Sequence, residues 1–349
     1  MDVLESFESV VASTRMRLAR NFADYPFPNV LLRDGHAEEQ AGEMISILSA
    51  ELEHVDSFTL YEMNCLPEET AALLREKNLI SRDLIANKRI SAAFISADEN
   101  ISIMINEEDH LRVQYFMKGL DLAKAYERVS GIDDIISDTI PFAFDSKFGY
   151  LTACPTNLGT GLRASVMLFL PALSRRGLMK KTAPQLSHGG LTVRGASGEG
   201  SGTEGDFFQV SNEMTLGFSE ADILDLVERA VEMLTELEIR ERMCMKAEGG
   251  LSLLDEIGRS YGALLGCRKI TATELASRVA DIKLGLALGY IEGERDGEKL
   301  IGELDDFMVK MRPANLKRLS GIQPDGEERD AYRARAAAET IKKMNLYLE

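Results

Sequence analysis

The segment SEADILDLVERAVEMLTELEIRERMCMK, residues 219–246, marks a change in the character of the chain. Its apolar residues recur at helical spacing, and Ser219 followed three residues later by Asp222 is a typical capping signal at a helix start. Similar helical patterns follow at 271–291, 298–313 and 327–348. The last third of the chain is therefore predicted to be almost entirely helical.

Upstream of this segment the sequence mixes strand and helix patterns. ISAAFISADENISIMINEEDH (90–110) predicts a hairpin, because two β-rich runs flank a short polar turn. The further expectations are helices at 36–54 and 112–130, strands at 147–156, 191–195 and 206–216, a buried segment at 163–173, and either helix or strand at 12–28. The chain is thus predicted to have an α+β fold, with a mixed part up to residue 246 followed by an all-α part.

Composition excludes several classes of protein. The 349 residues are 45% hydrophobic and 28% charged, as in an ordinary globular protein. A net charge of −17 makes a nucleic-acid partner unexpected, because no basic face would neutralise phosphates. No apolar run approaches the roughly 20 residues that span a bilayer, and the acidic N-terminus is unlike a signal peptide, so a cytoplasmic protein without a membrane partner is expected. The four cysteines and four histidines lack metal-ligand spacing, so no metal site is predicted.

A glycine-rich loop, VRGASGEGSGTEGDF at 193–207, contains the string G-x-G-x-x-G. A dinucleotide-binding turn would need a helix after the glycines, but DFFQVSN is a poor helix opener, and the acidic Asp225 lies inside a helical run. The other motifs of protein kinases and the lysine of a Walker loop are absent. The glycine string is therefore incidental, and Arg194 and Glu199 are the candidate functional residues of this loop.

Charged or nucleophilic groups gather in four stretches at predicted strand ends and loops. These are S-T-R-M-R (13–17), N-E-E-D-H-L-R (106–112), C-P-T-N-L-G-T-G-L-R (154–163) and residues 194–199. Together they supply five arginines: Arg15, Arg17, Arg112, Arg163 and Arg194. An arginine stays charged and donates two parallel hydrogen bonds to phosphate oxygens, so such a set is suited to bind a polyphosphate.

The four stretches occur in the order and at the spacing found in the guanidino (phosphagen) kinases, which this chain resembles over residues 11–245. The resemblance implies a catalytic domain at 1–246, with an antiparallel sheet flanked by helices, and a helical C-terminal domain at 247–349. It also implies ATP and Mg²⁺ as cofactors, because a metal ion bridges the phosphates during phosphoryl transfer.

The resemblance also implies roles for single residues. The five arginines bind the ATP phosphates, Glu108 and Glu199 clamp the substrate guanidinium, and Cys154 lies against it as a thiolate. Two carboxylates suit this task, because the guanidinium must be aligned with the γ-phosphate and must lose a proton. His110 is expected to be structural. The other residues expected to contact the nucleotide are Ser13, Thr14, Met16, Asn78, Ala164, Ser165, Val166, Met167, Gly195, Ala196, Ser197 and Gly198.

Two features favour a protein substrate over a free guanidino compound. Only twelve residues precede Ser13, where kinases of small guanidino compounds have a helical domain of roughly 100 residues with a substrate-covering loop. The tail contains R-D-x-x-R-A, formed by Arg329, Asp330, Arg333 and Ala334. Arg329 and Arg333 stand at i, i+4 and could grip a phosphate from one helix face.

With these features the chain resembles the bacterial McsB-type protein arginine kinases over nearly its whole length. That family also has Met at the position of Met167, but it usually has a nucleotide-contacting His where Asn78 stands here. The resemblance implies an allosteric phosphoarginine pocket at the tail motif and a homodimer formed by the helical domain. It further implies protein substrates bearing arginine, a zinc-binding activator of the McsA type, and a Clp ATPase that acts on the marked clients.

Two alternatives stay open at this point. A kinase for free arginine, creatine or taurocyamine would share the catalytic residues, and the missing substrate-covering domain disfavours it. A phosphoarginine-binding adaptor without catalysis would need only the tail motif, and the complete set of Glu108, Cys154, Glu199 and the arginines disfavours it.

Overall fold

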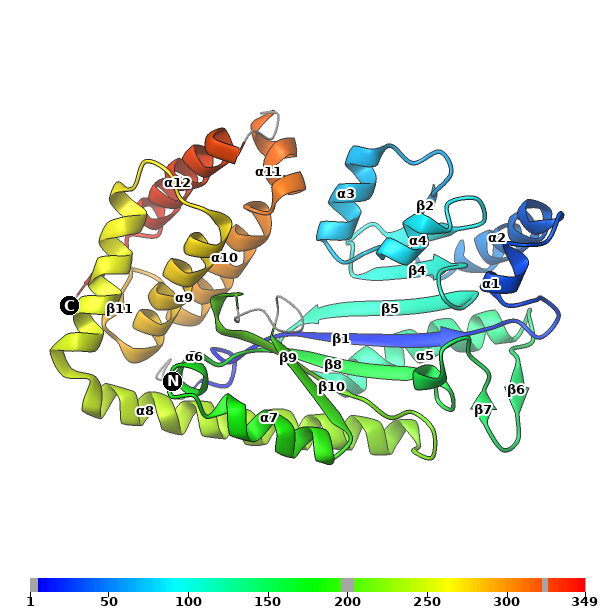
Figure 1. Cartoon of the computed structure of the whole chain (residues 1–349), viewed down its shortest axis with the longest axis horizontal. Helices are drawn as coiled ribbons and strands as arrows, with labels where there is room; N and C mark the ends of the chain where they lie inside the picture. The colour runs from blue at the N-terminus through cyan, green and yellow to red at the C-terminus, as the bar shows by residue number, and fades with distance from the viewer. Residues whose placement is uncertain (1–5, 196–203, 322–325, 349) are drawn as a thin grey trace. The chain divides into compact units, whose positions relative to one another are not determined.

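The computed structural model describes residues 6–195, 204–321 and 326–348 (Figure 1). These residues divide into two compact units. Unit 1 contains the first twelve residues, 167–210 and 230–349, and unit 2 contains 13–166 and 211–229. Each unit is described by itself below. No helix among the described residues combines the length and apolar character needed to cross a membrane.

The elements follow one another as a mixed N-terminal part and a helical C-terminal part. The strands are β1 (Val11–Arg20), β2 (Phe58–Glu62), β3 (Ala92–Ser96), β4 (Ile101–Ile105), β5 (Leu111–Lys118), β6 (Phe144–Asp145), β7 (Gly149–Tyr150), β8 (Leu162–Phe169), β9 (Leu191–Gly195), β10 (Phe207–Asn212), β11 (Ile291–Glu292) and β12 (Tyr347–Leu348). The α-helices are α1 (Pro28–Leu31), α2 (Ala37–Leu52), α3 (Glu68–Glu76), α4 (Arg82–Ala86), α5 (Leu122–Ser137), α6 (Pro171–Arg175), α7 (Met179–His188), α8 (Glu220–Gly266), α9 (Ala272–Leu288), α10 (Gly297–Lys310), α11 (Pro313–Ser320) and α12 (Gly326–Lys343). Short 3₁₀ turns cover Pro155–Asn157 and Glu204–Asp206.

The main sheet has eight strands in the order β2-β3-β4-β5-β1-β8-β10-β9. The pairs β2–β3, β3–β4, β4–β5 and β5–β1 are antiparallel. Strands β3 and β4 form the hairpin predicted at 90–110, and the Ser96 hydroxyl closes its turn by binding the Asp98 carboxylate at 2.6 Å. The predicted α+β fold, with an antiparallel sheet and a helical C-terminal region, is confirmed.

Two local predictions were wrong. Residues 112–130 were predicted to be one helix, but the first part is strand β5 and only the second part belongs to α5. β5 lies between β4 and β1, so its pairing on both edges outweighs the local helical pattern. The strand predicted at 147–156 is limited to β7, because Pro155 begins a 3₁₀ turn.

The segment left open between helix and strand is strand β1. Its side chains alternate between the two faces of the sheet, as a strand requires. Thr14, Met16 and Leu18 are buried on one face. Arg15 and Arg17 therefore both project from the other face.

Helix α8 begins where the sequence predicts. The Asp222 backbone N–H donates to the Ser219 hydroxyl at 3.1 Å, and the Ser219 N–H donates back to the Asp222 carboxylate at 3.0 Å. Its 47 residues are interrupted at Gly250, where φ is 44° and ψ is −144°. Glycine adopts this conformation without the steric cost that a Cβ would bring.

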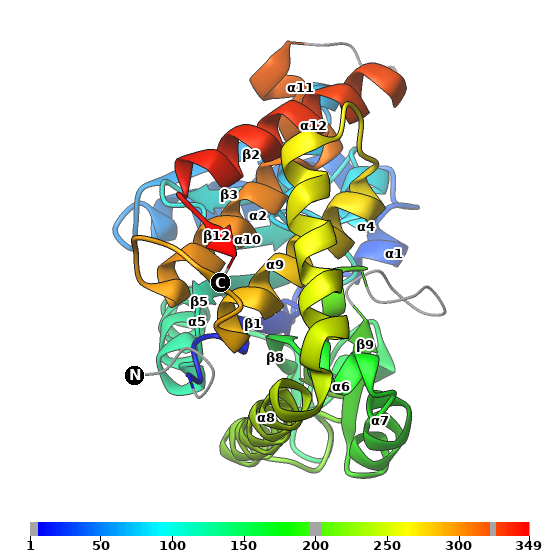
Figure 2. The same ribbon diagram turned by 90° about the vertical axis from the view of Figure 1, so that its left-hand side faces the viewer.

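Within unit 1 the buried side chain of Lys283 joins helix α9 to two strands and to α10. Helices α9, α10 and α12, seen from the side in Figure 2, share one hydrophobic core. The Lys283 ammonium on α9 lies 4.0 Å from the Phe169 ring centre and 4.3 Å from that of Phe207, and it donates to Asp305 at 2.7 Å. Burial lowers the pKa of Lys283. The two rings come from β8 and β10, so α9 is fixed to the ends of these strands in the same unit.

A second buried charge in unit 1 joins α8 to α6. Glu238 and Arg242 form an ion pair at 2.8 Å whose side chains are fully buried. Glu238 also accepts the N–H groups of Ala172 and Leu173 at 3.0 and 2.9 Å, at the start of α6. Arg242 donates to the Ser9 hydroxyl and to the Phe169 carbonyl. Both charged side chains therefore make hydrogen bonds to other residues in addition to their ion pair.

Candidate active site

In unit 2, strands β1, β5 and β8 carry the arginines that the sequence singled out. In the β1–β5 register, Arg17 stands opposite Gln114, and Arg112 stands opposite Ala19 two positions further along. Arg163 lies on β8, which neighbours β1 in the sheet. The structure thus brings Arg15, Arg17, Arg112 and Arg163 together on one region of the sheet.

The electrostatics of this cluster are those of an anion-binding site. Burial and then the charge of Arg112 lower the pKa of Arg15 to about 10. Burial, followed by repulsion from Arg15, Arg163 and Arg112, lowers the pKa of Arg17 well below its usual value. Among the described residues, the Nε atoms of Arg15 and Arg17 are buried without a hydrogen-bond partner. A polyanion such as the phosphates of ATP would relieve the repulsion and accept these hydrogen bonds.

Arg112 lies between two carboxylates of the loop before β5. It donates to the buried Glu107 at 2.7 Å and to Glu108 at 3.2 Å. The Glu108 side chain, predicted to clamp the substrate guanidinium, is 41% exposed and therefore accessible. Glu107 was not singled out as a site residue, and its proximity in sequence to Glu108 was the available signal. Arg112 thus links the predicted phosphate cluster to the predicted guanidinium clamp.

Gln114 is a further residue that the sequence did not reveal. Its side-chain oxygen accepts from Arg15 at 2.6 Å, and its amide nitrogen donates to the carbonyls of Asn78 and Leu79 at 2.9 and 3.2 Å. Asn78 has φ 60°, a left-handed conformation that asparagine tolerates better than most residues. Gln114 is therefore a positioning residue that fixes Arg15 relative to the end of α3.

Replacing Gln114 with methionine should weaken ATP binding more than it slows turnover. The variant removes the acceptor that orients Arg15 and the amide that donates to the Asn78 carbonyl, whereas the Leu79 carbonyl keeps the Ser102 hydroxyl as a donor. We therefore expect the KM for ATP to rise about tenfold, equivalent to about 1.4 kcal/mol. Steady-state kinetics at varied ATP measure the split between KM and kcat. The exposed Gln185→Met is the control, and a lower melting temperature with an unchanged KM would assign Gln114 a purely structural role.

Cys154 lies on a loop that a buried carboxylate holds in place. The Asp109 side chain accepts the Ala153 N–H at 2.6 Å and the Asn21 side-chain amide at 2.7 Å. The Cys154 sulfur lies 3.0 Å from the Thr156 hydroxyl oxygen. Asp109 was not predicted as a site residue, although it directly follows Glu108. It connects the loop of the predicted guanidinium clamp to the loop of the predicted thiolate.

His110 has a structural setting, as expected from the sequence. Its Nδ1 accepts the Phe22 N–H at 3.1 Å, and its Nε2 lies 2.9 Å from the Pro26 carbonyl, to which it donates. The imidazole stacks on the Phe22 ring with centres 5.6 Å apart. Burial lowers the pKa of His110 to about 4, so the ring is neutral at physiological pH.

The buried imidazole should make the fold less stable in acid. Above pH 6.5 the ring is neutral in both states and the stability is fully present. As the pH falls from 6.5 to about 4, only the unfolded chain binds the proton, so the free energy of unfolding should lose about 3 kcal/mol from this group. Urea titrations of wild type and His110→Gln at several pH values measure the difference. If the free energy of unfolding changed with pH in the same way in both proteins, His110 would not be the group that causes the loss of stability in acid.

The remaining predicted nucleotide-binding residues are distributed over both units. Met16, Ala164 and Val166 are buried, the Thr14 hydroxyl donates to the Gly119 carbonyl at 2.7 Å, and the Ser165 hydroxyl donates to the Arg15 carbonyl at 3.1 Å. Met167, Arg194 and Gly195 belong to unit 1, the last two at the end of β9. Ala196, Ser197, Gly198 and Glu199 lie outside the described residues. The nucleotide-binding roles of all these residues stay predictions.

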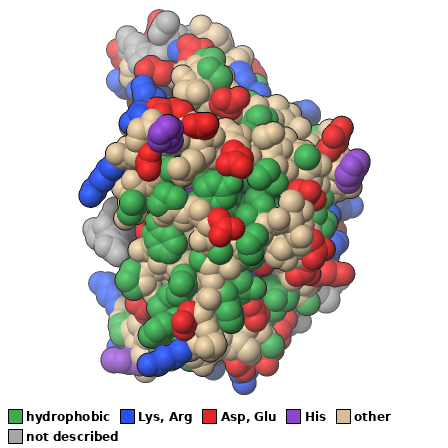
Figure 3. Space-filling model, turned by 90° about the vertical axis from the view of Figure 1, so that its right-hand side faces the viewer, with side chains coloured by type: hydrophobic (Ala, Val, Ile, Leu, Met, Phe, Trp, Pro, Cys, Tyr) green, Lys and Arg blue, Asp and Glu red, His purple; other side chains and the backbone are tan. Residues whose placement is uncertain are grey.

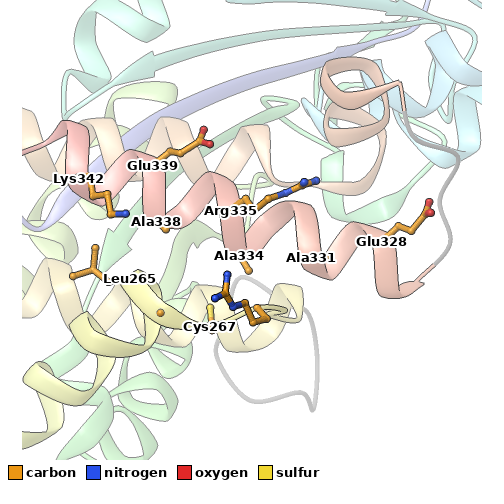
Figure 4. Close-up of a pocket in the computed structure, with 11 residues that line it drawn as sticks. Leu265, Cys267, Glu328, Ala331, Ala334, Arg335, Ala338, Glu339 and Lys342 are labelled. Atoms are coloured by element: carbon orange, nitrogen blue, oxygen red, sulfur yellow. The ribbon is translucent and has the colours of Figure 1, made fainter.

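The R-D-x-x-R-A motif lies on α12, beside a pocket of about 700 Å³. Arg333 is buried and donates to the Asp330 carboxylate at 2.7 Å and to the Met311 carbonyl at 3.2 Å. Ala334 lines the pocket, and Figure 4 shows the Lys342 side chain directed toward Leu265 across it. The lining residues are Leu265, Gly266, Cys267, Arg268, Glu328, Ala331, Ala334, Arg335, Ala338, Glu339 and Lys342. The phosphoarginine-binding role of the motif stays a prediction.

The half-buried arginines lie beside acidic residues, and the same acidic segment holds the cysteine loop. This arrangement is the one expected of a site for transfer of a phosphoryl group. The described residues contain no group of three or more His, Cys, Asp or Glu side chains arranged to hold a metal ion.

The comparisons with known proteins identify the family. Residues 40–241 match the family model "ATP:guanido phosphotransferase, C-terminal catalytic domain", and residues 250–347 match "Protein-arginine kinase McsB C-terminal domain". The chain belongs to the ATP:guanido phosphotransferase family. The predicted resemblance, fold and phosphotransferase class are thereby confirmed.

Curated relatives and solved structures agree with this assignment. A protein-arginine kinase from Caldanaerobacter subterraneus is 38% identical over 98% of this chain and 99% of its own length. The protein-arginine kinase of Geobacillus stearothermophilus is 40% identical over 96% of this chain and 92% of its own. Among solved structures, lombricine kinase matches with a TM-score of 0.57 and 25% identity over 66% of each chain. The substrate-free duplicated taurocyamine kinase from Schistosoma mansoni matches with a TM-score of 0.59 and 26% identity over 79% of this chain and 40% of its own.

Proposed function

We propose that this protein is an ATP-dependent protein arginine kinase, which transfers the γ-phosphoryl group of ATP to the guanidinium of arginine residues in proteins. The observation that carries the proposal is the match of both parts of the chain, since residues 250–347 match a C-terminal domain described for protein-arginine kinases. The curated relatives with this name cover nearly the whole chain.

The reaction assigns a task to each group of the site. A guanidinium nitrogen attacks the γ-phosphorus, the new P–N bond forms as the bond to the β,γ-bridging oxygen breaks, ADP leaves, and the nitrogen loses a proton. Glu108 and Glu199 align the guanidinium and one of them accepts this proton. Arg15, Arg17 and the neighbouring arginines bind the nucleotide oxygens, and Mg²⁺ supplies further neutralisation of the phosphates.

A phosphotransfer assay with two acceptors tests the proposal. Incubation with ATP and an arginine-rich protein should give acid-labile phosphoarginine, whereas free arginine, creatine and taurocyamine should be poor acceptors. Glu108→Gln should lose most activity, because it keeps the shape of the side chain but removes the negative charge. Efficient phosphorylation of free arginine would favour the small-substrate alternative, and phosphoarginine binding without turnover would favour the adaptor.

The physiological setting forms part of the same proposal. We place the protein in the cytoplasm as a homodimer whose phosphorylated clients pass to a Clp ATPase, with a zinc-binding activator of the McsA type. We also assign the tail motif a phosphoarginine-binding, allosteric role. Support comes from the matched C-terminal family segment and from the pocket lined by Ala334.

A further inference from the structure

Unit 2 exposes a group of large apolar side chains close to the Cys154 loop. The apolar surface, as we call it, consists of Phe144, Phe148, Met214, Leu216 and Phe218, which are between 37% and 61% exposed. Two of them lie on the β6–β7 hairpin, and three lie in the segment after β10. Figure 3 shows the side of the molecule that carries these elements, where hydrophobic side chains gather with few lysines or arginines among them. Single exposed apolar residues are common on protein surfaces, but a group of this kind marks a binding surface.

The two segments are joined by close backbone packing at two glycines. A Cβ on Gly149 would lie 2.6 Å from the Gly159 carbonyl oxygen, and a Cβ on Gly159 would lie 2.6 Å from that of Thr215 and 2.8 Å from the Leu216 Cα. Both glycines also have positive φ, at 73° and 108°. The hairpin and the segment after β10 therefore both pack against Gly159, and the apolar surface includes residues of both.

The apolar surface is continuous with the loop that carries Cys154. The Thr215 hydroxyl lies 2.6 Å from the Leu158 carbonyl and 3.0 Å from the Thr156 carbonyl, in the residues directly after Cys154. Thr215 is buried, whereas its neighbours Met214 and Leu216 are half exposed. The contacts of Thr215 hold these two side chains next to the proposed phosphotransfer site.

We propose that the apolar surface binds hydrophobic side chains that flank the target arginine in a protein substrate. This inference rests on the proposed function, since a free guanidino compound has no flanking chain to bind. The net charge of −17 also favours a partner that carries arginine, because a cationic guanidinium is attracted to a chain with an excess of negative charge. The exposed Glu213 beside Met214 adds negative charge at the edge of the surface.

Two peptides with one central arginine test the surface. In one peptide leucine and phenylalanine flank the arginine, and in the other serine and glycine do. For the apolar peptide, the double substitution Phe148→Ser and Leu216→Ser should raise the KM about tenfold with little change in kcat, as expected for loss of uniform binding. The KM for the polar peptide should not change. The matched control is the double substitution Val309→Ser and Leu319→Ser, which removes two apolar side chains of similar exposure in unit 1.

Binding without chemistry separates this inference from the proposed function. Fluorescence anisotropy with the apolar peptide, its arginine replaced by citrulline, should show about tenfold weaker binding to the double variant than to wild type. If wild type phosphorylates neither peptide but this difference in binding persists, the proposed function fails and the surface assignment holds. Equal KM values for both peptides, equal anisotropy for both proteins, or conversion of a dimer to a monomer by the double variant in sedimentation would each overturn the surface assignment.

Discussion

Arg17→Met should nearly abolish phosphoryl transfer and, at the same time, stabilise the fold. The Arg17 guanidinium is held on the sheet beside Arg15, and burial and three neighbouring arginines disfavour its charge. Its buried Nε has no hydrogen-bond partner among the described residues. Such an arrangement costs stability in the protein without nucleotide, and a bound polyanion offsets this cost.

The loss of activity should be large because charge is redistributed over the phosphates in the transition state. Removal of one preorganised donor of this kind typically lowers kcat by 10²–10³-fold, and loss of a transition-state arginine lowers it further, so we expect about a 10³-fold decrease in kcat/KM. Methionine fills much of the same volume without a charge. The free energy of unfolding should therefore rise by about 1–2 kcal/mol.

Three measurements check this pair of opposite effects. Phosphotransfer kinetics measure the loss of activity, chemical denaturation measures the gain in stability, and thermal melts with and without ATP should show that nucleotide no longer raises the melting temperature. Arg89→Met is the control, because Arg89 lies on the surface and pairs with Glu38. A variant that is less stable than wild type and still responds to ATP would show that Arg17 does not belong to an anion site.

The second large effect concerns the buried pair of Glu238 and Arg242. Arg242→Met leaves a carboxylate in the interior without its counter-charge, and the expected loss is about 3–5 kcal/mol in the free energy of unfolding. Burial already raises the pKa of Glu238, with the Arg242 charge opposing this shift. Without Arg242 the carboxyl group should bind a proton more readily, so the destabilisation should be smaller at pH 5 than at pH 8.

The same helix supplies a matched control for this prediction. Arg259 and Asp255 form an ion pair with the same i, i+4 spacing on α8, but their side chains are 75% and 57% exposed. Arg259→Met should leave the stability essentially unchanged, since exposed pairs are screened by water and salt. In a double-mutant cycle, Glu238→Gln combined with Arg242→Met should cost less than the sum of the single changes. Additive single effects would contradict a direct coupling between the two charges.

The sequence predicted those features that depend on local pattern. The start of α8 at Ser219, the β3–β4 hairpin and the strands beside the glycine-rich loop follow from periodicity and turn residues, and the structure confirms them. Residues 112–118 were predicted as helix, because pairing with strands on both sides cannot be read from their own sequence. The segment of β1 was likewise left open between helix and strand, because its pairing partners lie far away in the sequence.

The residues of the candidate site likewise fall into two groups, those that the local sequence reveals and those that it does not. Its arginines and carboxylates were identified because they occur in recognisable motifs. Gln114, which binds Arg15 on the neighbouring strand and two carbonyls 35 and 36 residues away, carries no local signal, because its role depends on the register between β1 and β5. Asp109 is similar, since the loop that it holds is 44 residues distant. Positioning residues of this kind depend on tertiary contacts, whereas phosphate-binding residues recur as motifs.

The contact of Lys283 with Phe169 and Phe207 restricts the replacement of the C-terminal helical segment by recombination during evolution. The two matched family segments meet at about residue 250, which suggests a module that recombination could replace. Yet Phe169 and Phe207 come from the first segment, and the ammonium group that lies over them comes from the second. A helical segment taken from a relative would need a cationic side chain at position 283. Without it, the Phe169 and Phe207 rings would lose their contact with the ammonium group. The two halves are therefore expected to have been inherited together, and a chimera joined at this boundary should reach the stability of its parents only when the incoming helical segment also carries a cation at position 283.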